Sequence, residues 1–548
     1  MKSCESGWIA RAFHAATAAC VAAALVAAWL WSPRVPYADA WRHYARLIDA
    51  SFARGVLAAD NGHPEVFANV VRWISLHQWH GNEDLQIVVG LLLALATLAA
   101  LLRIIWTDEG LSPSQRAAAM FTITLGIFWL GNARALLHDN ETLDVYSVLL
   151  CLALALGWTR TRPGDDASLR STIGATILCF MAAFNFGSGI AAFGALFAVL
   201  FIARATWLRW GIVVAGLAVT LVVYRLLAGS VGSPPLAPID QGLTAVRWLA
   251  APLIYLCWPV VDPAVGGVLR VGMIARAWTA VFGDVRTSAL PQAVCGTLLV
   301  IGVLRSTWRA RRDRRWTGAT HTLCLALAWF GLGVSALIAL TRVDYFAGFP
   351  AQIYAPRYLP WSSLAWAGWL GAWVTQRRST RWILGVVAGV GVLALSAEVG
   401  MTLVMRHQLE VANDTALAAV VGVDPGAAET GESDVEDVRV GAAAMKRLGA
   451  GPFAWSEAAL MGFPPPANAR RLAVGSWDMN RLRGTVEREW TLEAVIADPG
   501  CSTDRLLVLD RGRVAGLMRR VSGDRWRGVA RVETADPLFE VGALACRH

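Results

Sequence analysis

Long apolar runs constrain the fold of this chain more than any other feature of its sequence. About eleven segments are apolar over the roughly 20 residues that a helix needs to cross a bilayer core, or nearly so. Charged residues make up only 16% of the 548 positions, against roughly a quarter in soluble domains. The sequence therefore predicts a polytopic α-helical membrane protein. The expected spans lie near 9–31, 86–106, 117–131, 143–159, 172–184, 188–203, 210–228, 290–306, 319–341, 358–375 and 381–404.

Two stretches leave the number of spans open. The segment 172–203 could hold one span or two, and "NFGSG" at 185–189 favours two, because Asn and Gly tolerate a tight reversal. The segment 244–283 mixes apolar stretches with Arg247, Arg270 and other charges, which suits interfacial or re-entrant helices better than two more spans. The first run, 9–31, is followed by "SPRVP" with no small-residue cleavage pattern, so we expect a retained span rather than a signal peptide.

The basic residues predict the orientation of the chain. They cluster in 160–170, 305–315 and 376–381, which share one side of the membrane with Lys2 and Arg11 if the spans are as given. The positive-inside rule makes that side, and the N-terminus, cytoplasmic. The formal charge of +9 therefore carries topological information and does not indicate a nucleic-acid partner.

The opposite, outer face then receives the first loop, 32–85, and everything after the membrane domain 1–405. The tail, 406–548, is rich in charged residues and glycine and has no run long enough to span. We expect helices in 406–460 and short strands in 470–548, packed as a small extracytoplasmic β-sandwich. Cys501 and Cys546 are the only cysteines of this tail, and a disulfide between them is plausible in an oxidising compartment.

The first outer loop carries two amphipathic patterns. In "DAWRHYARLIDASF" one helical face predicts a helix on the bilayer surface, with Trp41 and Tyr44 at headgroup level. In "ADNGHPEVFANVVRWISLHQWHGNED" the sequence predicts a helix that starts at Pro64. The apolar face of the first helix is Trp41, Tyr44, Leu47, Ile48 and Phe52, and that of the second is Val66, Phe67, Val70, Trp73 and Ile74.

Polar side chains of the outer segments form a candidate site. Carboxylates come early in the chain and arginines late, all expected at one membrane face. A carboxylate such as Asp39 would take the proton of an attacking hydroxyl, while cations hold a lipid-linked phosphate leaving group. The candidates are Asp39, Asn61, His63, Glu65, His138, Asp139, Glu141, Arg225, Arg357 and Tyr358.

Each candidate also has a plain structural interpretation. Asp39 is a favoured helix N-cap residue, and the polar group before Pro64 suits capping as well. His138 to Glu141 would be a solvated turn, Arg225 would snorkel to the surface, and Arg357 with Tyr358 would be interfacial anchors. The histidines of the first loop form no tight ligand motif, so no cofactor or metal site is predicted, although a divalent metal is not excluded.

Several short stretches resemble the GT-C class of integral-membrane glycosyltransferases, in particular a bacterial multi-span subgroup. They are "YADAW", "NGHPEVFANVVRW", "FWLGNARALLHDNETLDVYSVLL", "FNFGSGIAAFGALF" and "APRYLPWSSLAW". The resemblance implies an inverting transferase of the bacterial inner (cytoplasmic) membrane. It would move a sugar from a polyprenyl-phosphate donor to a glycan, lipid or protein acceptor outside the cytoplasm, with Asp39 as the essential acid. Gly62 and Pro64 stand where this subgroup often has Glu and Arg, so Arg225 or Arg357 would have to bind the donor phosphate.

Two other function classes are compatible with the pattern. A saccharide or lipid transporter would place ionisable residues near mid-membrane, and the predicted spans are nearly free of charge at their centres. A non-catalytic assembly protein of the cell envelope would act through the tail, which shows no catalytic constellation, although fold does not decide function.

Overall fold

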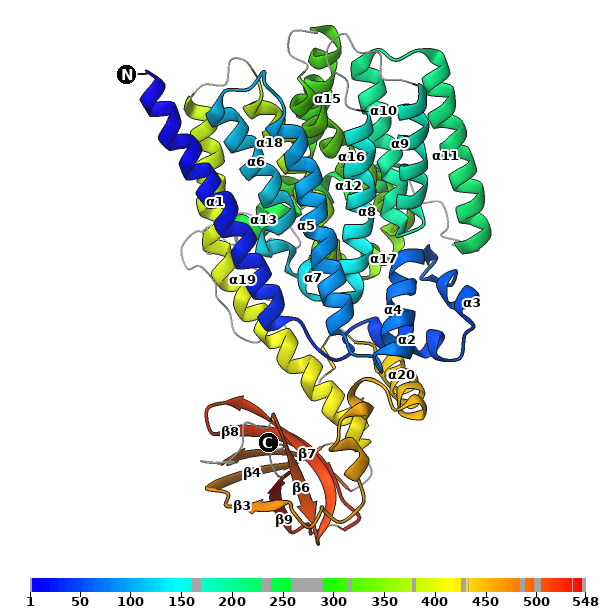
Figure 1. Ribbon diagram of the computed structural model, residues 1–548, viewed down its shortest axis with the longest axis vertical. Coiled ribbons are helices and arrows are strands. Elements are labelled where there is room, and N and C mark those ends of the chain that lie inside the picture. Colours follow the sequence, from blue (N-terminus) through cyan, green and yellow to red (C-terminus); the bar gives the residue numbers. More distant parts are fainter. Residues whose placement is uncertain are drawn as a thin grey trace. The chain divides into compact units, whose positions relative to one another are not determined.

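The computed structural model describes most of the chain as helix (Figure 1). The described residues are 2–159, 169–228, 238–257, 289–313, 318–376, 381–424, 430–431, 433–482, 488–496, 504–534 and 536–544. They divide into two compact units. The first comprises residues 1–32, 56–70 and 86–405, and the second comprises 33–55, 71–85 and 406–548. The second unit thus combines two pieces of the first loop with the tail.

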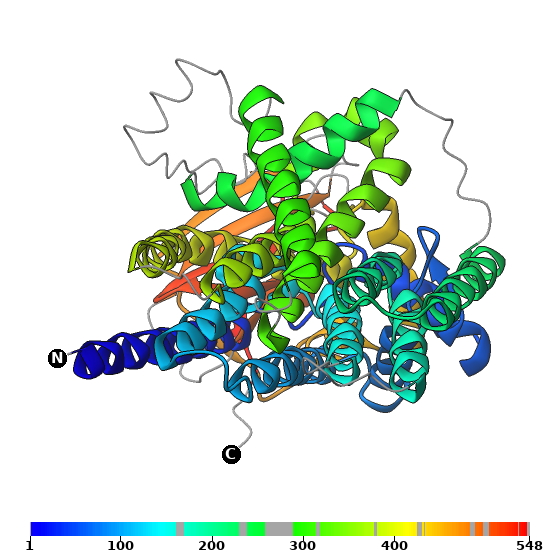
Figure 2. The same cartoon turned by 90° about the horizontal axis from the view of Figure 1, so that it is seen from above.

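The first unit is a helical bundle, seen nearly end-on in Figure 2. A helix occurs in each of the eleven ranges predicted as spans. They are α1 (Lys2–Trp31), α5 (Asp84–Trp106), α6 (Pro113–Phe128), α8 (Asp139–Trp158), α9 (Leu169–Ala183), α10 (Ala192–Ala203), α11 (Trp207–Ala228), α15 (Ala289–Arg312), α16 (Ala319–Thr341), α18 (Leu359–Val374) and α19 (Arg381–Val421).

Within the described ranges, eight candidate spans are long and apolar enough to cross a bilayer, one of which joins α6 to α7 (Ala133–Leu137) as Pro113–Leu137. The helices α9, α10 and α18 are shorter. The coarse prediction of a multi-helix protein with several membrane-length apolar helices is therefore confirmed, whereas the number of helices that cross stays a prediction. The apolar side chains of α11 are largely exposed, for example Val222 and Leu226, which is typical of a helix that lies against lipid.

Close backbone contact holds the centre of this bundle together. Helix α16 packs against α10, α12 (Pro238–Leu249) and α18. A Cβ on Gly368 of α18 would lie 2.5 Å from the carbonyl oxygen of Cys324, and one on Gly331 of α16 would lie 2.8 Å from that of Trp361. Small residues at such crossings let helices approach where lipid provides no hydrophobic drive.

The two ambiguous stretches have short helices. A 3₁₀ turn, η2 (Gly187–Ala191), separates α9 from α10, so the prediction of two helices in 172–203 is confirmed. Between 244 and 257 the chain forms the end of α12 and α13 (Ala251–Cys257), both shorter than the roughly 20 residues of a span. The rest of the ambiguous segment, 258–283, lies outside the described residues.

The second unit contains the first amphipathic helix of the loop, α2 (Ala40–Ile48). Its apolar face does not lie at headgroup level as predicted. Trp41 and Tyr44 are fully buried against α20 (Val435–Leu448), and the Tyr44 hydroxyl donates to Glu83 at 2.6 Å. The prediction of a surface helix with aromatic anchors is therefore wrong. An amphipathic period shows that a face is covered, but it does not distinguish protein from lipid as the cover.

The second loop helix also differs from the prediction. Helix α4 (Val66–Gln78) starts two residues after Pro64, and α3 (Phe52–Val56) is a single short turn upstream of it. The expected apolar stripe of α4 is only half-buried. Its most buried side chains are instead Ala68, Asn69, Arg72, Ser75 and Leu76.

The described strands of the tail form one seven-stranded antiparallel sheet. They are β3 (Arg470–Leu472), β4 (Ser476–Arg481), β5 (Glu489–Val495), β6 (Arg505–Asp510), β7 (Arg513–Ser522), β8 (Arg525–Arg531) and β9 (Phe539–Ala543), in the order β3-β9-β6-β7-β8-β5-β4. The expectation of a β-sandwich is therefore wrong for these strands. Alternating patterns predict strands, but they do not say whether the strands share one sheet or two.

The sheet curls into a half-barrel. The Trp490 and Trp477 rings, on β5 and β4, lie 6.2 and 6.3 Å from the Phe539 ring on β9, although these strands are far apart in the sheet order. Irregular register in β6–β7 and β7–β8 is expected to bend the strands. One face buries Val508 and Trp526 inside the curl, and the other packs on the end of α19. The predicted Cys501–Cys546 disulfide lies outside the described residues.

Candidate functional site

A β-hairpin with a two-residue turn contains the first candidate residues of the first unit. Strands β1 (Ala59–Asp60) and β2 (His63–Pro64) pair antiparallel, and Asn61 and Gly62 between them both have positive φ, 46° and 76°. Asn-Gly is the preferred sequence for this mirror-image turn, because both central residues must be left-handed. The interpretation of this segment as the cap of a helix starting at Pro64 is therefore wrong.

The hairpin fixes the imidazole of His63. Its Nδ1 lies 2.8 Å from the Tyr224 hydroxyl of α11, and that hydroxyl lies 3.1 Å from the Gly62 carbonyl oxygen. The Phe186 ring packs 5.0 Å from the imidazole. The backbone of Gly187 is so close that a Cβ there would lie 2.5 Å from His63 Nδ1. Glycine is therefore required at this position for the imidazole to keep its place.

Buried charges surround His63. The side chains of Asp60 and Glu65 are almost completely buried, and α4 is tied to the bundle by the Val66 amide, which donates to the Phe184 carbonyl at 2.9 Å. Burial lowers the pKa of His63, and the positive charge of Arg342 lowers it further, while Glu65 and Asp60 act in the opposite direction. The net effect keeps the imidazole neutral at pH 7.

Arg342 links this cluster to a second one through α17 (Val343–Gly348). Arg342 is the N-cap residue of that short helix, and Tyr345 lies one turn further along it. The Tyr345 hydroxyl is 3.2 Å from an Arg357 guanidinium nitrogen, and Gln352 Oε1 is also at 3.2 Å. One short helix therefore contributes to both groups.

Aromatic rings hold the Arg357 guanidinium. Its Cζ lies 5.1 Å from the Tyr358 ring centroid and 5.8 Å from that of Tyr345. Tyr358 in turn contacts Phe346 and Trp248, with ring centroids 5.9 and 6.5 Å apart. Among the described side chains, no carboxylate forms an ion pair with Arg357. The arrangement is a half-buried cation whose partners are neutral.

The described side chains of the turn 132–142 are buried or largely buried rather than solvated. Arg134 of α7 and Glu141 of α8 form an ion pair at 2.6 Å, and His138 between them is 2% exposed. The interpretation of His138 and Glu141 as parts of a solvated turn is therefore wrong. The short helix α7 packs against η6 (Pro356–Tyr358), so this turn lies beside the Arg357 segment. The side chain of Asp139 lies outside the described part of the structure.

Arg225 does not join these groups. It lies on the exposed side of α11 between Val222 and Leu226, both strongly exposed, as expected for an arginine that snorkels from an apolar face. The neighbouring residue, Tyr224, is the one that reaches His63. Asn61 is also exposed, and its role is the turn.

Asp39 belongs to the second unit. Its carboxylate, 46% exposed, pairs with Arg42 at 3.2 Å, and Arg42 also pairs with Asp437 of α20 at 2.5 Å. Asp39 occupies the N-cap position of α2, but its side chain makes no capping hydrogen bond. The predicted N-cap position of Asp39 is therefore confirmed, but its side chain does not cap the helix. The role of a general base stays a prediction.

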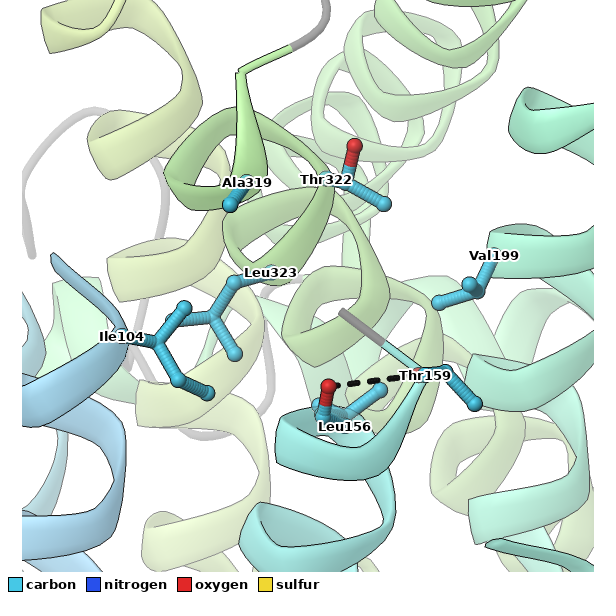
Figure 3. A pocket seen from close by; sticks show the side chains of 7 residues that line it. All are labelled: Ile104, Leu156, Thr159, Val199, Ala319, Thr322 and Leu323. Atoms are coloured by element: carbon cyan, nitrogen blue, oxygen red, sulfur yellow. Dashed lines mark hydrogen bonds between the residues drawn. The ribbon is translucent and has the colours of Figure 1, made fainter. Parts of the chain in front are cut away.

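The first unit also contains a cavity that is too small to be a substrate site. It has about 20 Å³ of space, roughly enough for one water molecule. Figure 3 shows its lining, which is mostly aliphatic with two threonine hydroxyls: Ile104, Leu156, Thr159, Val199, Ala319, Thr322 and Leu323.

No protein-family model, curated protein or solved structure matches this chain. The likeness to GT-C glycosyltransferases therefore rests on the short stretches of sequence given above. The functional argument has to rest on the two clusters around His63 and Arg357.

Sequence reasoning missed the residues that position these clusters. Tyr224 stands in an apolar run, where a tyrosine reads as an ordinary span residue. Gly187 was interpreted only as part of a turn, and its close approach to His63 has no signal in the sequence. The Asn61–Gly62 dipeptide is the exception, since it is a known hairpin signal and predicts the turn that places His63.

Proposed function

We propose that this chain transfers a sugar from a polyprenyl-phosphate donor to an acceptor at the extracytoplasmic face of the bacterial inner membrane. The observation that carries the proposal is the Arg357 guanidinium, held by Tyr345, Tyr358 and Gln352 with no ion-pair partner among the described carboxylates. The resemblance to GT-C enzymes supplies the donor class.

The chemistry of Arg357 suits a phosphate. A guanidinium withdrawn from water needs a counter-charge, and aromatic faces provide only part of it. Its planar fork of donors matches two oxygens of a phosphate group. In the proposed reaction Arg357 stabilises the negative charge that develops on the lipid phosphate as the sugar leaves.

The acceptor side of the reaction needs a proton acceptor. The resemblance assigns that role to Asp39, and the cluster of His63, Asp60 and Glu65 offers another set of candidates in the first unit. Both clusters belong to segments that the positive-inside rule places outside the cytoplasm, where lipid-linked sugars are presented. A non-cytoplasmic tail and an N-terminus in the cytoplasm are part of the same proposal.

Binding of the product lipid tests the proposal without knowledge of the sugar. Full-length protein in nanodiscs would be titrated with a polyprenyl phosphate, with the matching polyprenol as the neutral control. We expect the phosphate to bind at least tenfold tighter than the alcohol, and Arg357→Ala to remove that difference. Arg357→Lys should restore it only in part, since lysine lacks the bidentate geometry.

The matched control is Arg305→Ala, which removes an exposed arginine of α15 and should bind as the unaltered chain does. Equal affinity for phosphate and alcohol, or undiminished phosphate binding by Arg357→Ala, would contradict the proposal.

Transport of a lipid or saccharide is a second candidate, and one residue favours it. Glu398 lies within the apolar helix α19, and its Oε1 is buried without a hydrogen-bond partner in the described structure. The expectation that the spans are nearly free of charge concerned their centres, and Glu398 lies near the end of the predicted span 381–404. Ionisable groups within membrane helices often mark substrate or proton pathways. Flux into proteoliposomes that Glu398→Gln abolishes would favour this function over transfer.

A further inference from the structure

The hydrogen bonds around Tyr224 determine which nitrogen of His63 carries the proton. The Tyr224 hydroxyl has one hydrogen, and it lies 3.1 Å from the Gly62 carbonyl oxygen and 2.8 Å from His63 Nδ1. Both contacts are hydrogen bonds at once only if the hydroxyl hydrogen points to Gly62, because a carbonyl oxygen accepts and never donates. His63 Nδ1 must then be the donor to the Tyr224 oxygen. A neutral imidazole carries one N–H, so Nε2 is an unprotonated acceptor.

The surroundings hold this arrangement in place. Gly187 leaves no room for the imidazole to shift toward its backbone, and Phe186 packs on the ring. Four side chains act on the protonation of the imidazole. Tyr224 bonds to Nδ1. Arg342, together with burial, disfavours the imidazolium, whereas Asp60 and Glu65 favour it. General-base histidines are stabilised in their charged form by a nearby carboxylate, and Asp60 and Glu65 supply that negative charge here without bonding to the ring nitrogen that Tyr224 holds.

We propose that Nε2 of His63 accepts the proton of the attacking hydroxyl, and that His63 rather than Asp39 is the general base. This inference rests on the proposed function. The acceptor oxygen forms a bond to the anomeric carbon as the bond from that carbon to the phosphate oxygen breaks. The hydroxyl proton passes to Nε2, the electron pair of the broken bond leaves with the lipid phosphate toward Arg357, and the imidazolium later returns its proton to water.

Asp39 is a poorer candidate on the geometry of the second unit. Its carboxylate is already engaged by Arg42, which also binds Asp437. His63 Nε2 has no such partner among the described residues. In this assignment Tyr224 and Gly187 are positioning residues, because they act on the substrate only through the imidazole.

The tautomer can be measured without any substrate. The full chain, labelled with ¹⁵N in its histidine rings, would be studied by nuclear magnetic resonance in detergent, and His63→Gln would identify the His63 signals by their loss. We expect a neutral ring protonated at Nδ1 at pH 7. Tyr224→Phe should convert the ring to a mixture of tautomers, whereas Tyr146→Phe, a matched change at a buried tyrosine that bonds Ile127, should not.

Activity then tests the base role. General-base catalysis contributes roughly 10²–10⁴-fold, so His63→Gln should lower kcat by about that factor with little change in donor KM. Asp39→Asn should retain most of the activity. Tyr224→Phe should lower kcat less and change the pH profile, which loss of fold alone would not do.

The possible outcomes separate the two proposals. A ring protonated at Nε2, an imidazolium at pH 7, or full activity in His63→Gln would overturn the base assignment while leaving the transferase proposal in place. Loss of activity in Asp39→Asn with retention in His63→Gln would return the role to Asp39. If the unaltered chain binds no polyprenyl phosphate and transfers no sugar, the proposed function fails and the base role fails with it, whatever the tautomer.

Discussion

Replacing Trp41 by alanine is expected to destabilise the second unit strongly. Trp41 is 0% exposed and belongs to a cluster with Val438 and Met445 of α20. Truncation of a fully buried tryptophan costs about 3–5 kcal/mol, because it removes the buried area and leaves a cavity. Had the residue been a headgroup anchor, the same change would have left the protein core intact.

Hydrogen exchange of the α20 amides measures this cost locally. An opening free energy lowered by 3–5 kcal/mol accelerates exchange by roughly 150- to 4,000-fold, at about 1.4 kcal/mol for each factor of ten. The assay is mass spectrometry of peptides from residues 435–448 of the full chain in detergent. Trp79→Ala is the matched control, since Trp79 is 51% exposed and its loss should change exchange by less than about threefold. Equal exchange in the two variants would refute the packing of α2 on α20.

Three further predictions follow from the first unit. Arg134→Ala should cost about 3–5 kcal/mol in unfolding free energy, because it leaves the Glu141 carboxylate, only 18% exposed, without its ion-pair partner. The apolar pair Arg134→Met with Glu141→Leu should cost much less in the same thermal unfolding assay. Gly62→Ala should cost about 1–2 kcal/mol because the residue has φ of 76°, while Asn61→Gly should be nearly neutral by the same measure. Acidification below about pH 6.5 should reduce stability through His63, because its pKa is lowered in the folded protein and the unfolded chain therefore binds the proton more readily. The slope of unfolding temperature against pH should be shallower in His63→Gln. An unchanged slope would contradict the lowered pKa of His63.

Much of the fold of the first unit follows from the sequence, because long apolar runs predict helices. Each range predicted as a span contains a helix, and the turn residues at Asn185 predicted the reversal of the chain there. The sequence does not show what packs against an amphipathic face. Trp41 and Tyr44 look the same in sequence whether lipid or α20 lies against them. The curl of the tail sheet depends on contacts such as Trp490 with Phe539, which join strands distant in the chain and leave no local pattern.

The site was predicted less well than the fold, for a physical reason. Its composition was partly foreseen, since His63, Glu65, Arg357 and Tyr358 were all candidates. Its geometry depends on tertiary approach. Tyr224 reaches His63 from a helix more than 150 residues away in the chain, and Gly187 matters only because that imidazole lies against it. Arg225 was favoured because an arginine in an apolar run is conspicuous, yet the helix turns it outward.

Transfer of radiolabelled sugar by the purified full chain in proteoliposomes tests the central claim most directly. A panel of polyprenyl-phosphate sugars would be offered with membrane-extracted acceptors, and the anomeric configuration of the product would be determined. We predict transfer with inversion from at least one donor, its loss in Arg357→Ala, and its retention in Arg305→Ala. Absence of transfer from every donor by a folded protein, or equal transfer by Arg357→Ala, would contradict the claim.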